Sequence, residues 1–381
     1  MCSIAMASVN QPPLTNSGSD HEMSWLMAWF WNEDVWLPPG YTWYYLTHST
    51  HFSFPVFMDA WTYPFAIAAV FIAFRYLVLN PFVFAPLGRF LGIKDVRPRS
   101  PVHNDDLETV FRRYRTRPSP QVLVEAATGL GLTERQVERW LRQRAAVSKT
   151  SPLTKFCNLI WETSYYISYS ILGAVVLWDK EWLWNIDHCF IGFPEHSVDD
   201  WVWTYYMVSL GFYWSMTITH FFQHRRKDST QLFVHHLLTI LLISFSWVVN
   251  FVRIGTLVLV VHECGDIPML LAKICKLCGK QLGMDALFVI FLILWLCTRV
   301  GLYPFWIMKT TLFRAHVILQ VWYPVYYIFN GLLLGLLLIH IMWTYLILRI
   351  VVRMLLFKEI SDVRSSSEAS DEDDDTTKKE A

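Results

Sequence analysis

The sequence predicts an all-α polytopic membrane protein with about seven transmembrane helices and a small helical insert. The first observation is composition. Of the 381 residues, 54% are hydrophobic and 17% are charged, whereas globular chains carry about 25% charged residues. The second is that apolar stretches long enough to cross a bilayer recur along the chain. The third is that basic residues gather in alternate connections between these stretches, as the positive-inside rule requires.

Each predicted span is an apolar run of roughly 20 residues, the length of a helix that crosses the hydrocarbon core. The fourth and fifth runs are almost contiguous, so their helices are expected to form a tight hairpin. The predicted spans cover residues 60–79, 156–178, 201–222, 232–252, 255–277, 286–308 and 325–347.

The distribution of Lys and Arg predicts how the chain is oriented. Residues 80–155 contain fourteen Lys and Arg, whereas residues 179–200 contain only Lys180. Basic residues also follow the third, fifth and last spans, and cytosolic loops are enriched in such residues. We therefore expect a luminal N-terminus and a cytosolic C-terminus, which an odd number of spans permits.

These features divide the chain into five parts. An N-terminal extension with a Trp-rich luminal segment (1–59) precedes the first span (60–79) and a cytosolic insert (80–155). The main transmembrane domain (156–350) and an acidic tail (351–381) follow, and the composition of the tail predicts disorder. No cleavable signal peptide is expected, because the N-terminal residues lack an apolar core.

The insert contains LTERQVERWLRQRA (132–145), which predicts an amphipathic helix with Thr133 as N-cap and an apolar stripe that includes Val137 and Leu141. This stretch is similar to the recognition helix of a homeodomain, but Gln143 stands where the adenine-reading Asn would be. The residues before it are too few for a full three-helix module. We expect a small basic helical subdomain and no DNA binding.

The acidic tail carries two kinds of signal. Lys378 and Lys379 stand fourth and third from the end, the pattern of a dilysine retrieval address for the endoplasmic reticulum. Ser365 and Ser370 each precede an acidic residue by three positions, the pattern that acidophilic kinases favour. These serines are candidates for phosphorylation.

The fourth and fifth spans carry His235, His236, His262, Glu263 and Asp266 in apolar surroundings. Ionisable residues inside a membrane are costly and mark functional sites. His262 and Asp266 are four residues apart and share one helix face, which a hairpin would bring toward His235. A carboxylate that orients an imidazole makes it a better base or nucleophile. We therefore expect Asp266 to lie beside His235.

Two other interpretations of this cluster are open. The polar residues could be structural contacts between helices, or His235, His262 and Asp266 could bind a metal ion. The stretch HECGD lacks the second His of the H-E-x-x-H zinc motif. Cys275 and Cys278 form a C-x-x-C pair without the second pair that a zinc site requires. No metal site is expected.

The polar pattern resembles a known family. The stretch HHLLTILLISFSWVVNFVRIGTLVLVVH (235–262) resembles the longevity-assurance motif of ceramide synthases, which lies in their TLC domain. Similar matches are WLPP (36–39), FYWS (212–215), RRKD (225–228) and SDVRS (361–365). The resemblance implies acyl transfer from a fatty acyl-CoA to the amine of a sphingoid base, giving (dihydro)ceramide. It implies no cofactor other than acyl-CoA as co-substrate.

The resemblance also assigns roles within the polar cluster. The paired histidines of the family fall on His235 and His236, and the last Asp of its acidic pair falls on Asp266. We expect His235 either to accept the acyl group or to deprotonate the amine, while His236 and His262 hold the thioester oxygen. Further supporting roles go to Glu263 in the acidic pair, and to Asn250 and Arg253 in ordering the hairpin or contacting substrate.

The surroundings of the cluster complete this interpretation. Arg225, Arg226 and Lys227 are candidates to bind the phosphates of CoA, because guanidinium groups suit phosphate. In the family, the loop between the last two spans, here 309–323, governs the choice of acyl chain length. Partners are expected to be the two substrates, membrane lipids and a second synthase subunit, identical or related.

Three residues depart from the family pattern. Glu263 stands in place of Asp, Leu270 in place of Glu, and Pro268 is atypical. Two alternatives of another class therefore stand beside the enzyme. One is a non-catalytic TLC-domain lipid sensor or carrier, and the other is a regulatory partner in a heterodimer.

Overall fold

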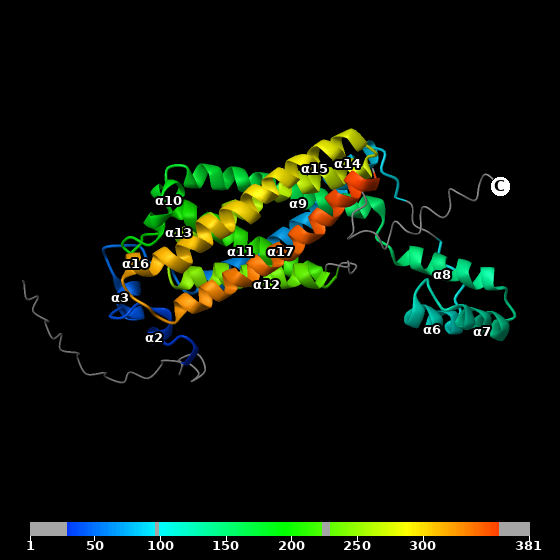
Figure 1. Ribbon diagram of the computed structural model, residues 1–381, viewed down its shortest axis with the longest axis horizontal. Helices are drawn as coiled ribbons and strands as arrows, with labels where there is room; N and C mark the ends of the chain where they lie inside the picture. The colour runs from blue at the N-terminus through cyan, green and yellow to red at the C-terminus, as the bar shows by residue number, and fades with distance from the viewer. Residues whose placement is uncertain (1–28, 96–98, 223–228, 358–381) are drawn as a thin grey trace, which may run out of the picture.

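The computed structural model describes residues 29–95, 99–222 and 229–357. Every regular element in these ranges is a helix, so the all-α prediction is confirmed. The main body is an elongated bundle, and three further helices stand beside one of its ends (Figure 1). We call this end the insert end. The opposite end, formed by residues 29–58, 178–199 and 309–324, is the cap end.

The chain runs through the bundle seven times within the described residues, alternating in direction, and the passes correspond to the seven apolar runs (Figure 1). In order they are α4 (Asp59–Phe74) with η1 (Arg75–Phe84) and α5 (Ala85–Phe90); α9 (Pro152–Leu177); α11 (Asp200–His220); α12 (Ser229–Val248); α13 (Val252–Glu263) with α14 (Asp266–Leu277); α15 (Gln281–Trp295) with η3 (Leu296–Met308), η4 (Thr310–Arg314) and α16 (Ala315–Leu319); and α17 (Val325–Phe357).

Five of these passes are long and apolar enough to cross a membrane: Asp59–Phe90, Thr230–Val248, Val252–Leu277, Gln281–Leu319 and Val325–Met354. The chain is therefore a multi-pass membrane protein, but the predicted count of seven spans is not confirmed. α9 and α11 are long enough, yet they are rich in Tyr, Trp, Ser and Thr. In α11 many of these side chains are buried by neighbouring helices, so this helix does not depend on apolar residues to face lipid.

The predicted hairpin between the fourth and fifth spans is confirmed. α12 and α13 are joined by a turn in which Asn250 adopts φ +63°, a left-handed conformation that Asn tolerates better than most residues. Its side-chain amide donates to the carbonyl oxygens of Pro194 at 2.9 Å and His196 at 2.7 Å. Asn250 therefore fixes the hairpin to the loop at the cap end.

π-helical turns interrupt two of the long passes. η1 contains Pro81 and η3 contains Pro304, and a proline inside a helix removes a backbone donor and clashes with the preceding turn. A wider π turn accommodates this without ending the helix. In η3 the same stretch carries Arg299 and Tyr303, which are both buried.

The insert forms a three-helix module of α6 (Asp105–Tyr114), α7 (Pro120–Leu130) and α8 (Glu134–Ser148). The predicted helix with Thr133 as N-cap is confirmed, and Gln136 completes a capping box. The expectation that the preceding residues are too few for three helices is wrong, because α6 and α7 are short and their connections are tight. The shared core consists of Leu107, Phe111, Leu123, Ala127, Val137 and Leu141.

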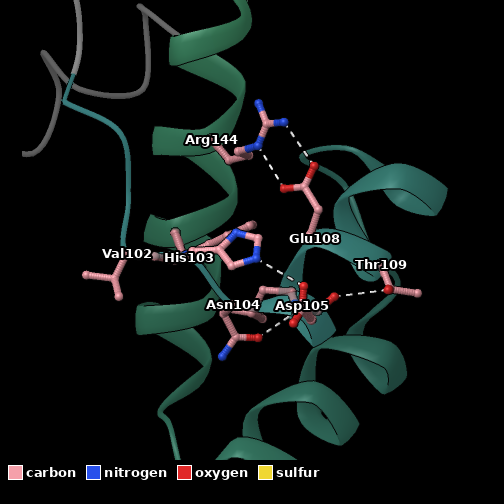
Figure 2. A network of polar contacts seen from close by, with 9 residues as sticks. Val102, His103, Asn104, Asp105, Glu108, Thr109 and Arg144 are labelled. Atoms are coloured by element: carbon pink, nitrogen blue, oxygen red, sulfur yellow. Dashed lines mark hydrogen bonds and ion pairs between the residues drawn. The ribbon is translucent and has the colours of Figure 1, made fainter.

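Polar contacts at the surface of the insert hold α6 against α8 (Figure 2). The Arg144 guanidinium donates to both carboxylate oxygens of Glu108, at 2.8 and 2.9 Å. The hydrogen bond from Arg144 lowers the pKa of Glu108 below its usual value. Asn104 caps α6 by accepting from the backbone N–H of Leu107, and His103 contacts Asp105 at 3.0 Å.

Candidate active site

The helix that carries the predicted acidic pair is interrupted within the HECGD stretch. α13 ends at Glu263 and α14 begins at Asp266. Pro268 lies in the first turn of α14, where its missing N–H costs no intrahelical hydrogen bond. The helix is thus broken a few residues before Pro268. The break lies deep in the bundle and places three ionisable side chains on different sides of one backbone.

His235 and His262 lie near each other with a third histidine between them. The His235 ring centroid is 6.5 Å from that of His340, and the His262 centroid is 4.9 Å from it. The ring centroid of Trp343 lies 5.2 Å from that of His235, and the ring centroid of Tyr303 lies 5.0 Å from that of His262. The predicted approach of α12 to the end of α13 is therefore present, and α17 contributes His340 to it.

The hydrogen bonds of these histidines differ. Nδ1 of His262 lies 2.6 Å from the carbonyl oxygen of Val258, which can only accept, so Nδ1 carries the proton. The neutral ring then presents a lone pair at Nε2, and this atom is buried without a hydrogen-bond partner. Nδ1 of His235 and both ring nitrogens of His340 are likewise buried and unpartnered. Unsatisfied buried polar atoms are rare and costly.

Asp266 pairs with an arginine rather than with His235. Its carboxylate lies 3.3 Å from the Arg299 guanidinium of η3, which is 4% exposed. Arg299 also donates to the carbonyl oxygens of Val261, at 2.8 Å, and His262. These are carbonyls that the break in the helix leaves without intrahelical donors. Arg299 therefore holds the break together, and the structure does not bring Asp266 to His235 as the sequence predicted.

Glu263 is buried and is not among the residues that line the cavity. It is 1% exposed, and neither carboxylate oxygen has a hydrogen-bond partner among the described residues. Its surroundings include Tyr165 and Tyr169 of α9 and Tyr205 of α11, which lie within electrostatic range of the carboxylate. A buried group without a partner costs stability. This position therefore has no evident structural purpose.

A cavity runs from the histidines toward the cap end. Its lining comes from α11, α12, α13, α16 and α17 together with the loops at the cap end. His235 and His262 lie at one end, and Ser246 lies eleven residues along α12 from His235, or roughly 16 Å. The walls are mainly apolar and include Leu242, Ile243, Ile254, Val258, Leu259, Phe329, Leu333 and Leu336. The shape and lining suit a long apolar chain.

Gly255 permits the packing of one cavity wall. A Cβ atom at this position would lie 1.6 Å from the hydroxyl of Tyr206. That hydroxyl shares a 2.7 Å hydrogen bond with Ser246, and all three residues line the cavity. Glycine is thus required at position 255, because α11 and α13 approach too closely there for a larger residue.

Comparisons with known proteins agree with this architecture. A family model for the TLC domain matches residues 155–349. Human ceramide synthase 5 is 36% identical over 364 residues, covering 93% of this chain and 90% of the relative. Human ceramide synthase 3 is 35% identical over 344 residues, covering 89% and 88%. The chain belongs to the ceramide synthase family. A more distant relative, ceramide synthase hyl-1 of Caenorhabditis elegans, is 29% identical over 356 residues, covering 90% and 85%.

In this member of the ceramide synthase family, two expected supporting residues are structural. Asn250 fixes the hairpin turn, as described above. Arg253 donates to the carbonyl oxygen of His188 at 2.8 Å and lies over the ring of Trp182 at 4.8 Å. The sequence allowed two roles for both residues, ordering the hairpin or contacting substrate. The contacts that the structure shows correspond to the first role.

The remaining predicted residues fall into two groups. His236 is 4% exposed and lies against Tyr213, with ring centroids 5.9 Å apart; Tyr213 lines the cavity, whereas His236 does not. Seven others lie outside the described residues: Arg225, Arg226, Lys227, Ser365, Ser370, Lys378 and Lys379. Across the described ranges, no group of three or more His, Cys, Asp or Glu side chains is close enough to hold a metal ion.

Sequence reasoning missed Arg299 and His340. Both residues lie within predicted membrane spans, Arg299 in 286–308 and His340 in 325–347, and neither was assigned a role. The signal was present, because a lone ionisable residue within an apolar span is itself a functional candidate. What the sequence does not state is which helix face carries each residue, and therefore that both meet the end of α13.

Proposed function

We propose that this chain is a ceramide synthase that transfers a fatty acyl group from acyl-CoA to the amine of a sphingoid base. The observation that carries the proposal is the apolar cavity that begins at His235 and His262 inside the matched TLC domain. Its apolar lining suits an acyl chain, whose carbonyl carbon would then lie among unpartnered imidazoles.

The reaction needs a neutral amine, an attack on the thioester and a place for the proton. In a two-step route, His235 attacks the carbonyl carbon, the C–S bond breaks, and the thiolate leaves with the imidazole proton as CoA thiol. The amine then attacks the acyl-imidazole: the amide C–N bond forms, the bond between the acyl carbon and the imidazole nitrogen breaks, and the proton lost by the amine returns to His235. In a one-step route the amine attacks the thioester directly, His235 accepts the amine proton, the C–S bond breaks, and CoA leaves as the thiol with that proton.

The geometry supports a different role for His262 from the one the sequence suggested. Its Nε2 presents a lone pair, because the proton is held at Nδ1 by the Val258 carbonyl. Such a nitrogen accepts a proton, whereas holding a thioester oxygen needs a donor. His262 is thus suited to draw the proton from the attacking amine or from His235. His340 has both ring nitrogens unpartnered, so its N–H is available to the thioester oxygen.

An N-acylation assay tests the proposal. Membranes containing the chain would be given a sphingoid base and a panel of acyl-CoAs, and N-acyl product would be quantified. We expect product from the wild type and a loss of at least roughly 100-fold in His235→Ala, the size of a removed acid–base or nucleophilic group. His51→Ala, an exposed histidine at the cap end, is the matched control. No product from the wild type at normal expression would overturn the proposal.

The location of the chain is also proposed. The basic residues of the insert support a cytosolic insert end and a luminal cap end. The dilysine pattern of Lys378 and Lys379 supports the membrane of the endoplasmic reticulum. α11 ends and α12 begins at the cytosolic side in this orientation, so acyl-CoA would approach there. Glycosylation acceptor sites introduced between α10 (Glu181–Trp184) and α11, and separately within the insert, test the orientation. Modification of the insert rather than the cap end would reverse it.

A further inference from the structure

One face of α8 carries three arginines on the side remote from the core of the insert. Arg135, Arg139 and Arg142 are separated by four and three residues, so they share one face of the helix. All three residues are exposed. The core residues Val137 and Leu141 lie on the opposite side of α8, because each residue turns the helix by about 100°. We call these three arginines the basic face.

The basic face has little negative charge to pair with inside the insert. Arg142 contacts Glu138 at 2.9 Å, and both side chains of this pair are exposed. Neither Arg135 nor Arg139 forms a hydrogen bond or ion pair with another residue in the described part of the chain. In contrast, Arg144 on the other side of α8 is held at two points by Glu108. The arginines of α8 thus divide into one that holds the module together and a set that faces outward.

The C-terminal tail contains a dense run of negative charge. Residues 368–375 include six Asp and Glu and no Lys or Arg. We call this run the acidic stretch; it lies outside the described residues. It follows α17, which ends at Phe357 and runs toward the insert end of the bundle (Figure 1). The tail therefore leaves the bundle on the side where α8 stands.

The chain between α17 and the acidic stretch is long enough to reach the basic face. Eleven residues lead from Phe357 to Glu368, which allows about 36 Å when extended. α8 ends at Ser148 and α9 begins at Pro152, so a short link joins α8 to the bundle. The 15 residues of α8 extend roughly 22 Å. The distance that the tail must cover is therefore within its length.

We propose that the acidic stretch binds the basic face of α8 in the same molecule. A guanidinium group binds a carboxylate through two parallel hydrogen bonds, the arrangement that Arg144 and Glu108 already form in this module. Single exposed ion pairs are weak. Several pairs act together here, and attachment to one chain raises the effective concentration of the tail to about the millimolar range. The contact joins the end of the last span to the insert and does not depend on the reaction.

Two other anionic partners fit the basic face less well. α8 extends away from the insert end of the bundle (Figure 1), so much of the basic face lies away from a membrane that surrounds the bundle. A nucleic acid would meet Gln143 where a homeodomain presents its adenine-reading Asn. The acidic stretch needs neither a flat surface nor a base contact.

Photo-crosslinking of the full chain in phosphatidylcholine nanodiscs tests the proposal. Ala369, inside the acidic stretch, is replaced by photoreactive p-benzoylphenylalanine, and crosslinked peptides are mapped by mass spectrometry. We expect crosslinks to residues 134–148 at low ionic strength. Their yield should fall roughly threefold or more in about 0.5 M salt, because exposed ion pairs are screened. Arg135→Gln/Arg139→Gln/Arg142→Gln should lower the yield to the same extent.

Matched variants separate loss of charge from loss of fold. Arg112→Gln/Arg113→Gln removes two exposed charges from α6 and should leave the yield unchanged. Asp373→Asn/Asp374→Asn/Asp375→Asn changes only the tail, so it cannot unfold the insert, and it should reduce the yield as the α8 variant does. An equal loss in the α6 control would overturn the assignment to the basic face.

The remaining outcomes decide the occupant. A yield that neither salt nor the α8 variant changes would overturn the electrostatic contact. Crosslinks found mainly between differently tagged copies in one nanodisc would show that the tail of a second chain binds instead, and would overturn the intramolecular contact. Loss of the crosslink when phosphatidylserine is added would show that an anionic membrane surface outcompetes the tail, and would also overturn the proposal.

Discussion

Polar side chains that join the helices of the insert are paired at its surface, whereas several in the bundle are buried and unpaired. In the insert, Glu108 and Arg144 form a two-point contact (Figure 2). In the bundle, Glu263 and His340 have no partner for either polar atom of their side chains among the described residues. Surface pairs contribute little to stability, whereas unpaired buried groups are expensive. The contrast separates polar residues that stabilise helices from those whose presence needs a chemical reason.

The exception within the bundle is Arg299, and breaking its contacts should have the largest effect. Arg299→Ala removes this ion-pair partner of Asp266 and the guanidinium donor of the Val261 and His262 carbonyl oxygens. We expect a loss of about 3 kcal/mol, typical of a broken buried pair, together with loss of activity. Thermal unfolding of the purified protein in detergent measures it. The double variant Arg299→Ala/Asp266→Asn should recover part of the loss, and an unchanged melting temperature in Arg299→Ala would contradict the role.

The two regions also differ in how closely they pack around glycine. Gly255→Ala in the bundle would force the Tyr206 hydroxyl out of place, and overpacking of this kind costs about 1–3 kcal/mol. In α7 of the insert, a Cβ atom at Gly129 would have nothing within 4 Å. Gly129→Ala should therefore stabilise its helix slightly, by about 0.5–1 kcal/mol. Melting temperatures of the full chain and hydrogen exchange in α7 distinguish these outcomes, and equal effects would remove the contrast.

Neutralising the unpaired carboxylate should behave differently from breaking a pair. Glu263→Gln keeps the shape of the side chain and replaces a buried ionisable group that has no hydrogen-bond partner among the described residues. We expect the free energy of unfolding to stay within about 1 kcal/mol of the wild type or to rise. A large loss of thermal stability would show that Glu263 has a structural partner. The N-acylation assay on the same variant reports whether the reaction uses its charge.

The smallest effect is expected from pH in the insert. Hydrogen bonding to Arg144 lowers the pKa of Glu108 in the folded state. The pair therefore stabilises the insert above the ordinary pKa of Glu, and this stability is lost as pH falls through the lowered value. Hydrogen exchange in α6 and α8 of the full chain should quicken over that acidic window. Glu108→Gln should flatten the response, and an identical response in both would contradict the assignment.

Features that depend on neighbouring residues were predictable from the sequence. Thr133 as an N-cap and the tight turn at Asn250 follow from local chemistry, and both are present. The apposition of His235 and Asp266 was not predictable, because it depends on how helices rotate and slide against one another. Arg299 comes from a helix far along the chain and competes for the same carboxylate. No local sequence pattern indicates that Arg299 pairs with Asp266.

The self-contained core of the insert has a consequence for how the chain folds. Its buried residues come only from α6, α7 and α8, and the neighbouring hydrophobic contacts are also its own. Removing this module from the loop would expose no core residue of the bundle. The three helices thus form a self-contained unit whose fold does not depend on the membrane bundle.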